Sequence, residues 1–367
     1  MVWKARHDNL RIDKILEKKY FAELSRAIRG LNGANDIQKY SAALEDEFSR
    51  KFGFIHSKSV GSGTQAFTLF LWLLSLNSRG KKAEVIVPAA EYYSLTSSFS
   101  CFPDIKMRLC DVNPENFAID TEKAEKLVNR DTKAIVAAHM FGNACNMKEL
   151  VKIKEKNNLV LLEDACQAIG NKIDDKYLGS LGDFAIFSFS NEKFISSIGS
   201  SGGGMLTFKS EENAEKISRL MQAKELKGIS RISLPAISSI AVQLRYFSKM
   251  QERHNKMKEL YFKELSGINE IRIINSKNKN EGLYTRLVIQ LEGEDERNML
   301  HDFLKKRNIL AELPYPAICI FSENQNRKFP GAEDYYKRCL HLPFFHFIKE
   351  DEIRQISAAV REFFRKK

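Results

Sequence analysis

Residues 158–164 read Asn158-Leu159-Val160-Leu161-Leu162-Glu163-Asp164. A short apolar run of this kind, ending in acidic residues, predicts a buried β-strand with a polar end. Three more apolar runs of strand length lie at 84–88, 133–139 and 184–189. Helix-like patterns such as 120–129 and 147–156 lie between the runs. This alternation predicts an α/β fold with a mostly parallel sheet covered by helices on both faces.

The length and the change of pattern along the chain predict two domains. The chain has 367 residues, and single hydrophobic cores stop growing near about 250–300 residues. From about residue 245 the alternation gives way to a charge-rich helical pattern, a strand candidate at 283–290 and further helices. We expect a large α/β domain over residues 1–245 and a smaller α+β domain over residues 246–367.

The composition excludes several classes of protein. The chain is 43% hydrophobic and 29% charged, which is typical of a globular protein. The net charge is +11, but basic and acidic residues are interleaved, which favours a solvated basic surface over nucleic-acid binding. The longest apolar run, about 66–76, is shorter than the roughly 20 residues of a membrane span, and no apolar segment typical of a signal peptide follows the N-terminus. We expect a cytoplasmic protein with no nucleic-acid and no membrane partner.

The cysteines show no spacing typical of a metal site or a disulfide framework. No CxxC pair occurs among Cys101, Cys110, Cys145, Cys166, Cys319 and Cys339. We interpret them as free thiols and expect no metal centre.

A glycine-rich turn, Val60-Gly61-Ser62-Gly63-Thr64-Gln65-Ala66, leads into the helical run 67–76. Small residues let a ligand approach the backbone, and the N–H groups at a helix N-terminus attract an anion. The spacings of the Walker loop and of the dinucleotide fingerprint are absent. The turn is a candidate phosphate site, and a glycine turn that merely starts a helix is the alternative.

Asp164 stands at the end of an apolar strand, where ligands collect in α/β sheets. An aspartate in this place can pair with a protonated ring nitrogen, which is how enzymes that use pyridoxal 5'-phosphate keep the cofactor an electron sink. The alternative is an Asp that caps the next helix. Because neighbouring side chains of a strand point to opposite faces, only one of Glu163 and Asp164 can face a cofactor.

The segment 179–193 sets Ser188 at the end of a strand and Lys193 five residues later. A loop rich in small residues, 199–204, follows. A lysine near a phosphate site can form a Schiff base with an aldehyde. A surface lysine is the alternative for Lys193 taken alone.

Taken in order, the Ser-Gly-Thr turn, the Asp-Ala-x-Gln strand end and the Ser-Phe-x-x-x-Lys segment resemble the DegT/StrS family of sugar aminotransferases. Further similarity lies at 44–48, 85–88, 139–142 and 340–343, so that the resemblance covers most of the chain. It implies a fold type I transferase that depends on pyridoxal 5'-phosphate.

The resemblance also implies roles for individual residues. Lys193 would form the Schiff base and Asp164 would pair with the pyridine nitrogen, which makes these two the catalytic residues. The other residues implied to bind the cofactor are Tyr92 on its ring, Gln167 near its hydroxyl group or the substrate, and Gly63, Thr64 and Ser188 on its phosphate. A core or rim aromatic is the alternative for Tyr92, and a surface amide is the alternative for Gln167.

The reaction that the resemblance implies is ping-pong transfer of an amino group from an amino acid, expected to be glutamate, to a keto sugar linked to a nucleotide. The protein would be a homodimer with its active site at the subunit interface. Some branches of the family carry histidine in place of the lysine and are dehydratases, so Lys193 favours transamination. A pyridoxal phosphate enzyme acting on a non-sugar carbonyl or catalysing elimination, and a non-catalytic regulatory relative, are the alternatives.

Several positions depart from the family's pattern. Ile229 stands where the family commonly has an Asn that reaches the partner subunit's phosphate, whereas Arg231 is retained. Glu91 and Tyr93 flank the stacking position, and the segments 190–192 and 313–317 also differ. The change at Ile229 bears on the contact between the two subunits, and the other departures predict an atypical substrate.

Overall fold

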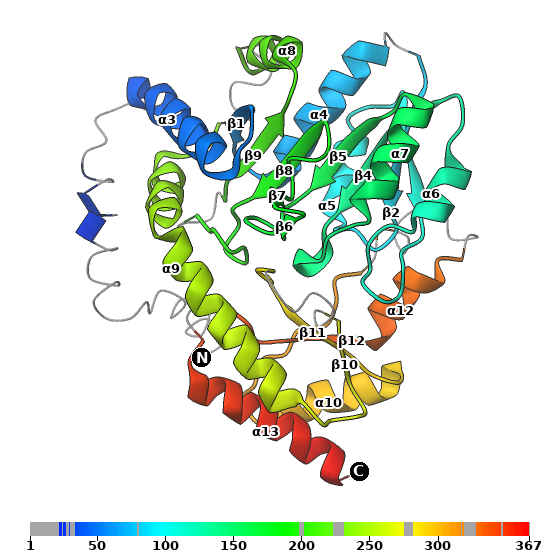
Figure 1. Ribbon diagram of the computed structural model, residues 1–367, viewed down its shortest axis with the longest axis vertical. Helices are drawn as coiled ribbons and strands as arrows, with labels where there is room; N and C mark the ends of the chain where they lie inside the picture. The colour runs from blue at the N-terminus through cyan, green and yellow to red at the C-terminus, as the bar shows by residue number, and fades with distance from the viewer. Residues whose placement is uncertain are drawn as a thin grey trace.

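A computed structural model describes most of the chain (Figure 1). The described residues are 22, 23, 25, 26, 29, 34–78, 81–197, 202–222, 231–274, 282–316, 318, 328–345 and 348–366.

A seven-stranded sheet with the order β1-β9-β8-β5-β4-β2-β3 forms the centre of the large domain. Its strands are β1 (His56–Val60), β2 (Ala83–Pro88), β3 (Ile105–Cys110), β4 (Thr132–Ala138), β5 (Val160–Asp164), β8 (Phe184–Ser188) and β9 (Gly204–Phe208). From β8 to β3 all neighbours run parallel, and β9 runs antiparallel to both β1 and β8. The four strands predicted from apolar runs are confirmed, and so is the mostly parallel α/β sheet.

Helices cover both faces of this sheet, as Figure 1 shows. They are α3 (Ala34–Phe52), α4 (Gly63–Ser78), α5 (Ser94–Phe99), α6 (Thr121–Leu127), α7 (Met147–Asn157), α8 (Glu211–Gln222) and α9 (Leu234–Leu265). Successive side chains of a strand point to opposite faces of the sheet, so they pack against different helices. Val85 and Val87 pack in the core with α4, whereas Ile86 packs in the core with α6 and α7. Two short strands, β6 (Lys172–Ile173) and β7 (Lys176–Tyr177), and the 3-10 helix η2 (Met140–Gly142) lie in the connections.

The C-terminal part contains a second, antiparallel sheet with the order β10-β11-β12. Its elements are β10 (Arg272–Ile273), β11 (Leu287–Gln290), α10 (Glu294–Lys306), α12 (Pro330–Arg338), β12 (Cys339–Leu342) and α13 (Glu350–Lys366). The boundary expected at residues 245 and 246 falls inside α9, which packs against the large domain as far as Met250 and against the second core from Met257. The division into 1–245 and 246–367 stays a prediction.

The strand predicted over 283–290 begins later, at Leu287. The residues before it bond to side chains instead of to a neighbouring strand. Asn171 accepts from the N–H of Leu283 (2.5 Å) and donates to its carbonyl (3.0 Å), and the N–H of Tyr284 donates to His254 (3.1 Å). Since these backbone groups are already satisfied, the chain stays irregular there and passes the end of the large sheet.

A buried aspartate joins α12 to the large domain. The carboxylate of Asp111 accepts from the N–H groups of Gly331 (3.3 Å) and Ala332 (3.2 Å), and it pairs with Lys123 (2.8 Å). A Cβ on Gly331 would lie 2.0 Å from the carbonyl oxygen of Val112, so only glycine permits this close approach.

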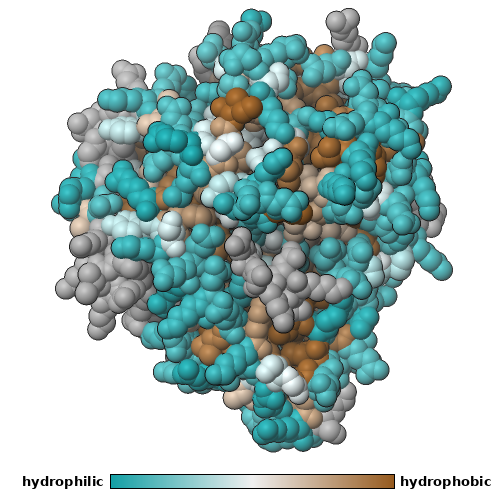
Figure 2. Space-filling view, viewed as in Figure 1, coloured by the Kyte–Doolittle hydropathy of each residue, from teal (hydrophilic) through white to brown (hydrophobic). Residues whose placement is uncertain are grey.

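Figure 2 shows a face on which polar side chains predominate and apolar ones form separate patches. No helix within the described residues is long and apolar enough to cross a membrane. Cys101, Cys110, Cys145, Cys166 and Cys339 are free thiols, and Cys319 lies outside the described residues.

Candidate active site

The sheet brings the ends of distant segments to one edge. Strand β5 ends at Asp164 and strand β8 ends at Ser188. Asp164 lies beside Ala138 of β4 on one side and beside Ile186 of β8 on the other. Ligands of parallel sheets bind at the carboxyl ends of the strands. Asp164 and Ser188 therefore lie where a cofactor is expected.

Asp164 is only 7% exposed. Its Oδ1 accepts from the N–H of Cys166 (3.0 Å). The residues that follow, 165–171, form turns and not a helix. Asp164 thus stabilises a tight turn, and the alternative in which it caps a helix is wrong.

Glu163 points to the opposite side of the strand. Its carboxylate accepts from the N–H groups of Gly179 (2.8 Å), Leu181 (2.7 Å) and Gly182 (2.5 Å). It is also paired with His139 Nε2 at 2.9 Å. Burial opposes ionisation, but the bonds from His139 and the backbone hold the pKa of Glu163 below its usual value. Glu163 therefore stabilises the turn before β8.

The tautomer of His139 follows from its second hydrogen bond. The N–H of Cys145 donates to Nδ1 of His139 at 3.1 Å. A backbone N–H only donates, so Nδ1 carries no proton and Nε2 carries the one that is donated to Glu163. His139 is therefore a neutral imidazole.

The glycine turn lies directly against the other predicted residues. Gly63 is the first residue of α4, and a Cβ on it would lie 2.9 Å from Cβ of Ser188 and 3.2 Å from Sγ of Cys166. Thr64 in the same helical turn donates to Ser94 Oγ (3.1 Å). The structure thus brings Gly63, Thr64 and Ser188 together at a helix N-terminus, as a phosphate site requires.

Gly204 of strand β9 packs directly against the backbone of this turn. We therefore expect a side chain at position 204 to destabilise the turn. A Cβ on Gly204 would lie 2.4 Å from both C and O of Ser62 and 2.7 Å from N of Gly63. We expect Gly204→Ala to displace the turn, to lower the free energy of unfolding by about 1–3 kcal/mol or more, and to weaken phosphate binding. Urea unfolding and titration with pyridoxal phosphate measure the two effects.

Gly203→Ala is the matched control for Gly204→Ala. The three heavy atoms nearest to its Cβ would all belong to side chains, those of Ile232 (3.2 Å), Ile240 (3.3 Å) and Phe189 (3.4 Å). These side chains can shift by a few tenths of an ångström, so we expect a smaller loss. If the two substitutions lowered the free energy of unfolding and the binding of pyridoxal phosphate equally, the close packing of Gly204 against the turn would not be what matters.

Lys193 follows β8 in a bend and is partly buried; its N–H donates to the carbonyl of Ser190 (2.9 Å). Its ammonium group acts electrostatically on Cys166: burial and the negative charge of Asp164 raise the pKa of that thiol, and Lys193 lowers it. Lys193 and Asp164 also both act on Glu91. The lysine, the aspartate and the glycine turn therefore meet around one site.

Tyr92 lies at the rim of this site, 38% exposed. Its ring centroid is 4.7 Å from that of Tyr93 and 5.2 Å from that of Tyr315, which meets it edge-on. Burial, with a contribution from Tyr93, raises the pKa of Tyr92 to about 12, so the hydroxyl stays protonated at neutral pH.

Gln167 is held between the two parts of the chain. Its Oε1 accepts from the N–H of Phe141 (3.1 Å) and from the hydroxyl of Thr285 (3.2 Å). The amide is thus held in place by Phe141 and by Thr285, which lies 118 residues away in the sequence, and the surface-amide alternative is wrong.

The sequence interpretation missed an ion-pair network that includes Glu192, the residue before Lys193. Arg286 donates to Glu192 (2.6 Å) and to the hydroxyl of Tyr315 (3.0 Å), and it pairs with Glu312. Tyr315 also donates to Glu192 (2.8 Å). Arg286 could have been noticed in the sequence because it lies in the apolar run 283–290. Nothing in the sequence indicated its partners.

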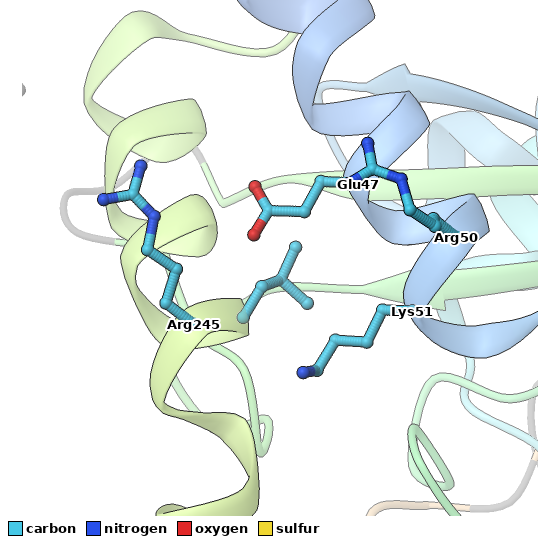
Figure 3. Close-up of a pocket in the computed structure, with 5 residues that line it drawn as sticks. Glu47, Arg50, Lys51 and Arg245 are labelled. Atoms are coloured by element: carbon cyan, nitrogen blue, oxygen red, sulfur yellow. The ribbon is translucent and has the colours of Figure 1, made fainter.

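A separate surface hollow of about 220 Å³ lies between α3 and α9. Figure 3 shows Glu47, Arg50 and Lys51 of α3 facing Arg245 of α9 across it. None of the predicted site residues lines it, so it is distinct from the candidate active site.

Comparison with known proteins relates the chain to one family over nearly its whole length. The DegT/DnrJ/EryC1/StrS aminotransferase family matches residues 16–361. The chain is 26% identical over 343 residues to a GDP-perosamine synthase of Vibrio cholerae, covering 89% of this chain and 91% of the relative. It is 27% identical over 343 residues to a pleiotropic regulatory protein of Geobacillus stearothermophilus, covering 89% and 90%.

Solved structures show the same fold. The putative sugar aminotransferase Spr1654 of Streptococcus pneumoniae, in its PLP form, superposes with a TM-score of 0.83 at 20% identity, covering 95% of this chain and 96% of that one. The expected fold type I architecture is therefore confirmed. The family match also confirms the aminotransferase class and its cofactor, pyridoxal phosphate. On the evidence of a match over residues 16–361, this chain belongs to the DegT/DnrJ/EryC1/StrS aminotransferase family.

Proposed function

We propose that the protein transfers an amino group from an amino acid, glutamate being the expected donor, to a keto sugar linked to a nucleotide. The observation that carries the proposal is the meeting of Lys193, Asp164 and the Gly63 turn at one sheet edge, in a chain of this family. The name of the Vibrio relative, a GDP-perosamine synthase, supports the sugar and the nucleotide.

The residues at the site fit pyridoxal phosphate. The N-terminus of α4 and the close approach of Gly63 to Ser188 suit a phosphate, and Asp164 suits a protonated ring nitrogen. Glu91 Oε2 is buried without a hydrogen-bond partner among the described residues, as expected beside a polar ligand. When bound, the cofactor supplies an electron sink for the carbon that carries the amino group.

Each predicted residue has a proposed part in this reaction. Lys193 would hold the cofactor covalently through Nζ, and once displaced by the donor its amine would accept and return the proton that moves. Asp164 would keep the ring nitrogen protonated. The remaining contacts are proposed for Tyr92 on the ring face, for Gln167 near the ring hydroxyl, and for Gly63, Thr64 and Ser188 on the phosphate.

Arg286 would act through its neighbours. It holds Glu192, the residue before Lys193, and it contacts Tyr315, whose ring packs on Tyr92. By binding both, Arg286 would orient the lysine loop and the stacking tyrosine together. Its own side chain is largely buried, at 15% exposure, so the pairing is well sheltered from solvent.

Assembly and location are also proposals. We propose a cytoplasmic homodimer with its active sites at the subunit interface. The position of Ile229, which would face the partner subunit, lies outside the described residues.

A regulatory function and a different reaction are the alternatives to sugar transamination. The Geobacillus relative carries the name of a regulatory protein, and a non-catalytic relative would be free to lose the lysine, the aspartate or the phosphate turn. This chain retains Lys193, Asp164 and Gly63. A non-sugar carbonyl substrate or an elimination reaction would use the same three elements, and only product analysis separates it from sugar transamination.

The deciding experiment incubates the protein with pyridoxal phosphate, glutamate and a set of keto sugars linked to nucleotides. We expect 2-oxoglutarate to form in step with an amino sugar, because the ping-pong reaction couples the two half-reactions. Turnover of simple ketones alone would contradict the sugar substrate, and release of ammonia without amino sugar would indicate elimination. Protein without added acceptor is the control.

A further inference from the structure

The side-chain amide of Gln167 can be oriented in only one way. The N–H of Phe141 lies 3.1 Å from one of its two end atoms. Because a backbone N–H only donates, that atom must be the oxygen, Oε1. The hydroxyl of Thr285 lies 3.2 Å from the same atom and therefore also donates to it. Oε1 thus accepts from two donors, and the NH2 group of Gln167 points away from both.

The NH2 group of Gln167 has no acceptor among the residues that the structure describes. It is not sealed in the interior either, since Gln167 is half-buried and its Nε2 is not one of the buried polar atoms that lack a partner. Gln167 lies three residues after Asp164, at the carboxyl end of β5, where ligands of parallel sheets bind. An NH2 group only donates, so the ligand atom that it meets must be an acceptor.

Phe141, the first of the two donors, belongs to the turn after β4 and has a strained backbone. Its φ is 59°, a left-handed conformation that is rare for a bulky residue and persists only where the surrounding structure holds it. The side chain is buried, and its ring packs on Tyr335 (centroids 5.6 Å apart) and on His341 (5.4 Å). The N–H of Phe141 is therefore a donor with a fixed position.

Thr285, the second donor, is fixed because its neighbours in the chain are bound by side chains from other segments. The two residues before it bond to Asn171 and His254. The residue after it, Arg286, binds Glu192. The hydroxyl of Thr285 thus reaches the amide from a backbone that is held on both sides.

We propose that Thr285 is a positioning residue that fixes the amide of Gln167 with its NH2 group directed at the ring oxygen of the bound cofactor. The inference rests on the proposed function in one respect, the place of Gln167 near that oxygen. The N–H of Phe141 alone would leave the amide able to swing about a single hydrogen bond, whereas two donors on Oε1 hold its plane. Thr285 thereby acts on the cofactor through Gln167 and without touching it, and the donor needs no rearrangement when the cofactor binds.

A fixed donor at the ring oxygen changes how readily the bound cofactor loses its proton. A hydrogen bond to an oxygen stabilises the form in which that oxygen is more negative, which is the deprotonated form of the bound cofactor. The donor therefore lowers the pH at which the visible spectrum of the bound cofactor changes. Loss of the Thr285 hydroxyl should raise this pH by about 0.3–1 unit, the equivalent of one hydrogen bond.

The test is a pH titration of the visible spectrum of the full-length protein loaded with pyridoxal phosphate. Thr285→Val keeps the shape of the side chain but has no hydroxyl, so the spectral change should move to higher pH. Thr285→Ser keeps the hydroxyl and should restore the pH of the wild type. Thr285 and Gln167 do not ionise, so the substitutions leave in place the charged groups around the site, which are Glu91, Asp164, Glu192, Lys193, Arg286 and Glu312.

Gln167→Leu shows whether Thr285 acts through the amide. It removes the donor itself, so it should raise the pH of the spectral change at least as far as Thr285→Val does. Adding Thr285→Val to Gln167→Leu should then cause no further shift, because residues that act through one contact are not additive. An unchanged pH in Thr285→Val would overturn the proposal, and so would equal shifts from Thr285→Val with and without Gln167, because Thr285 would then act by another route.

Thr132→Val is the matched control. Thr132 is the first residue of β4, at the end of the strand away from the site, and its hydroxyl accepts from the N–H of Asn129 (3.0 Å). The variant loses a comparable hydrogen bond and should leave the pH of the spectral change unmoved. An equal shift in this control would overturn the proposal. Thr285→Ala gives the same measurement if Thr285→Val does not fold.

The titration needs the bound cofactor but neither a sugar nor transamination. If Thr285→Val raised the pH of the spectral change but the wild type aminated no keto sugar, the proposed substrate alone would be refuted. If the wild type aminated keto sugars and Thr285→Val left the pH unmoved, this inference alone would be refuted. If the wild type gave no visible band with pyridoxal phosphate, both would be overturned.

Discussion

Lys193→Ala is expected to abolish the amino transfer. Loss of proton transfer by the lysine alone costs about 10²–10⁴-fold in rate, and the variant also loses the only covalent attachment proposed for the cofactor. The wild type mixed with pyridoxal phosphate should show a visible absorption band that glutamate bleaches, as lysine-bound cofactor does in this class. Absorption spectra before and after adding glutamate, together with the rate of 2-oxoglutarate formation, measure both losses.

Lys193→Arg is the control that keeps the positive charge at this position. Its guanidinium remains protonated in proteins and cannot act as a base, so we expect it to be as inactive as Lys193→Ala. If either variant kept a rate within about tenfold of the wild type, far less than the loss of a general base costs, Lys193 would not be the lysine that binds the cofactor.

Asp164→Asn is expected to lower the rate of the half-reaction with the donor by about 10²–10³-fold, the usual effect of removing a preorganised electrostatic partner. The amide keeps the oxygen that accepts from the N–H of Cys166, so the turn after β5 should persist. Loss of the charge removes the group that keeps the ring nitrogen protonated. Single-turnover kinetics with glutamate measure the rate, and the change should appear in kcat more than in KM.

Asp175→Asn is the matched control for Asp164→Asn, since Asp175 is an exposed residue of the turn between β6 and β7. We expect its rate to stay within about twofold of the wild type, because surface substitutions seldom matter. Equal rates for the two variants would show that Asp164 does not face the cofactor.

Local patterns in the sequence were enough to predict the central strands of the large sheet and the position of Asp164 and Ser188 at the ends of two of them. The apolar runs at 84–88, 133–139 and 184–189 became β2, β4 and β8, because continuous apolar segments of this length are buried on both faces of a parallel sheet. The rule that ligands collect at carboxyl ends of strands then placed Asp164 and Ser188 at one edge. The motif order around Gly63, Asp164 and Lys193 identified the family, which the match over residues 16–361 confirms.

The C-terminal part of the chain was harder to predict. The strand expected over 283–290 begins only at Leu287. The backbone groups of Leu283 and Tyr284 bond instead to the side chains of Asn171 and His254, which lie far away in the sequence. Propensity describes what a segment prefers by itself, and here tertiary hydrogen bonds to its backbone overrode that preference.

Composition, apolar periodicity and motif order therefore determined the α/β class, the mostly parallel sheet and the lysine and aspartate at its edge, because each of these depends on neighbouring residues in the chain. Only the tertiary structure decided which distant groups meet there. The antiparallel strand β9 brings Gly204 into contact with the turn at Ser62 and Gly63, and Arg286 binds Glu192, which lies 94 residues away in the sequence. The physical reason is that the order of strands in the sheet, which sequence periodicity does not encode, determines the burial and the charges that these groups experience.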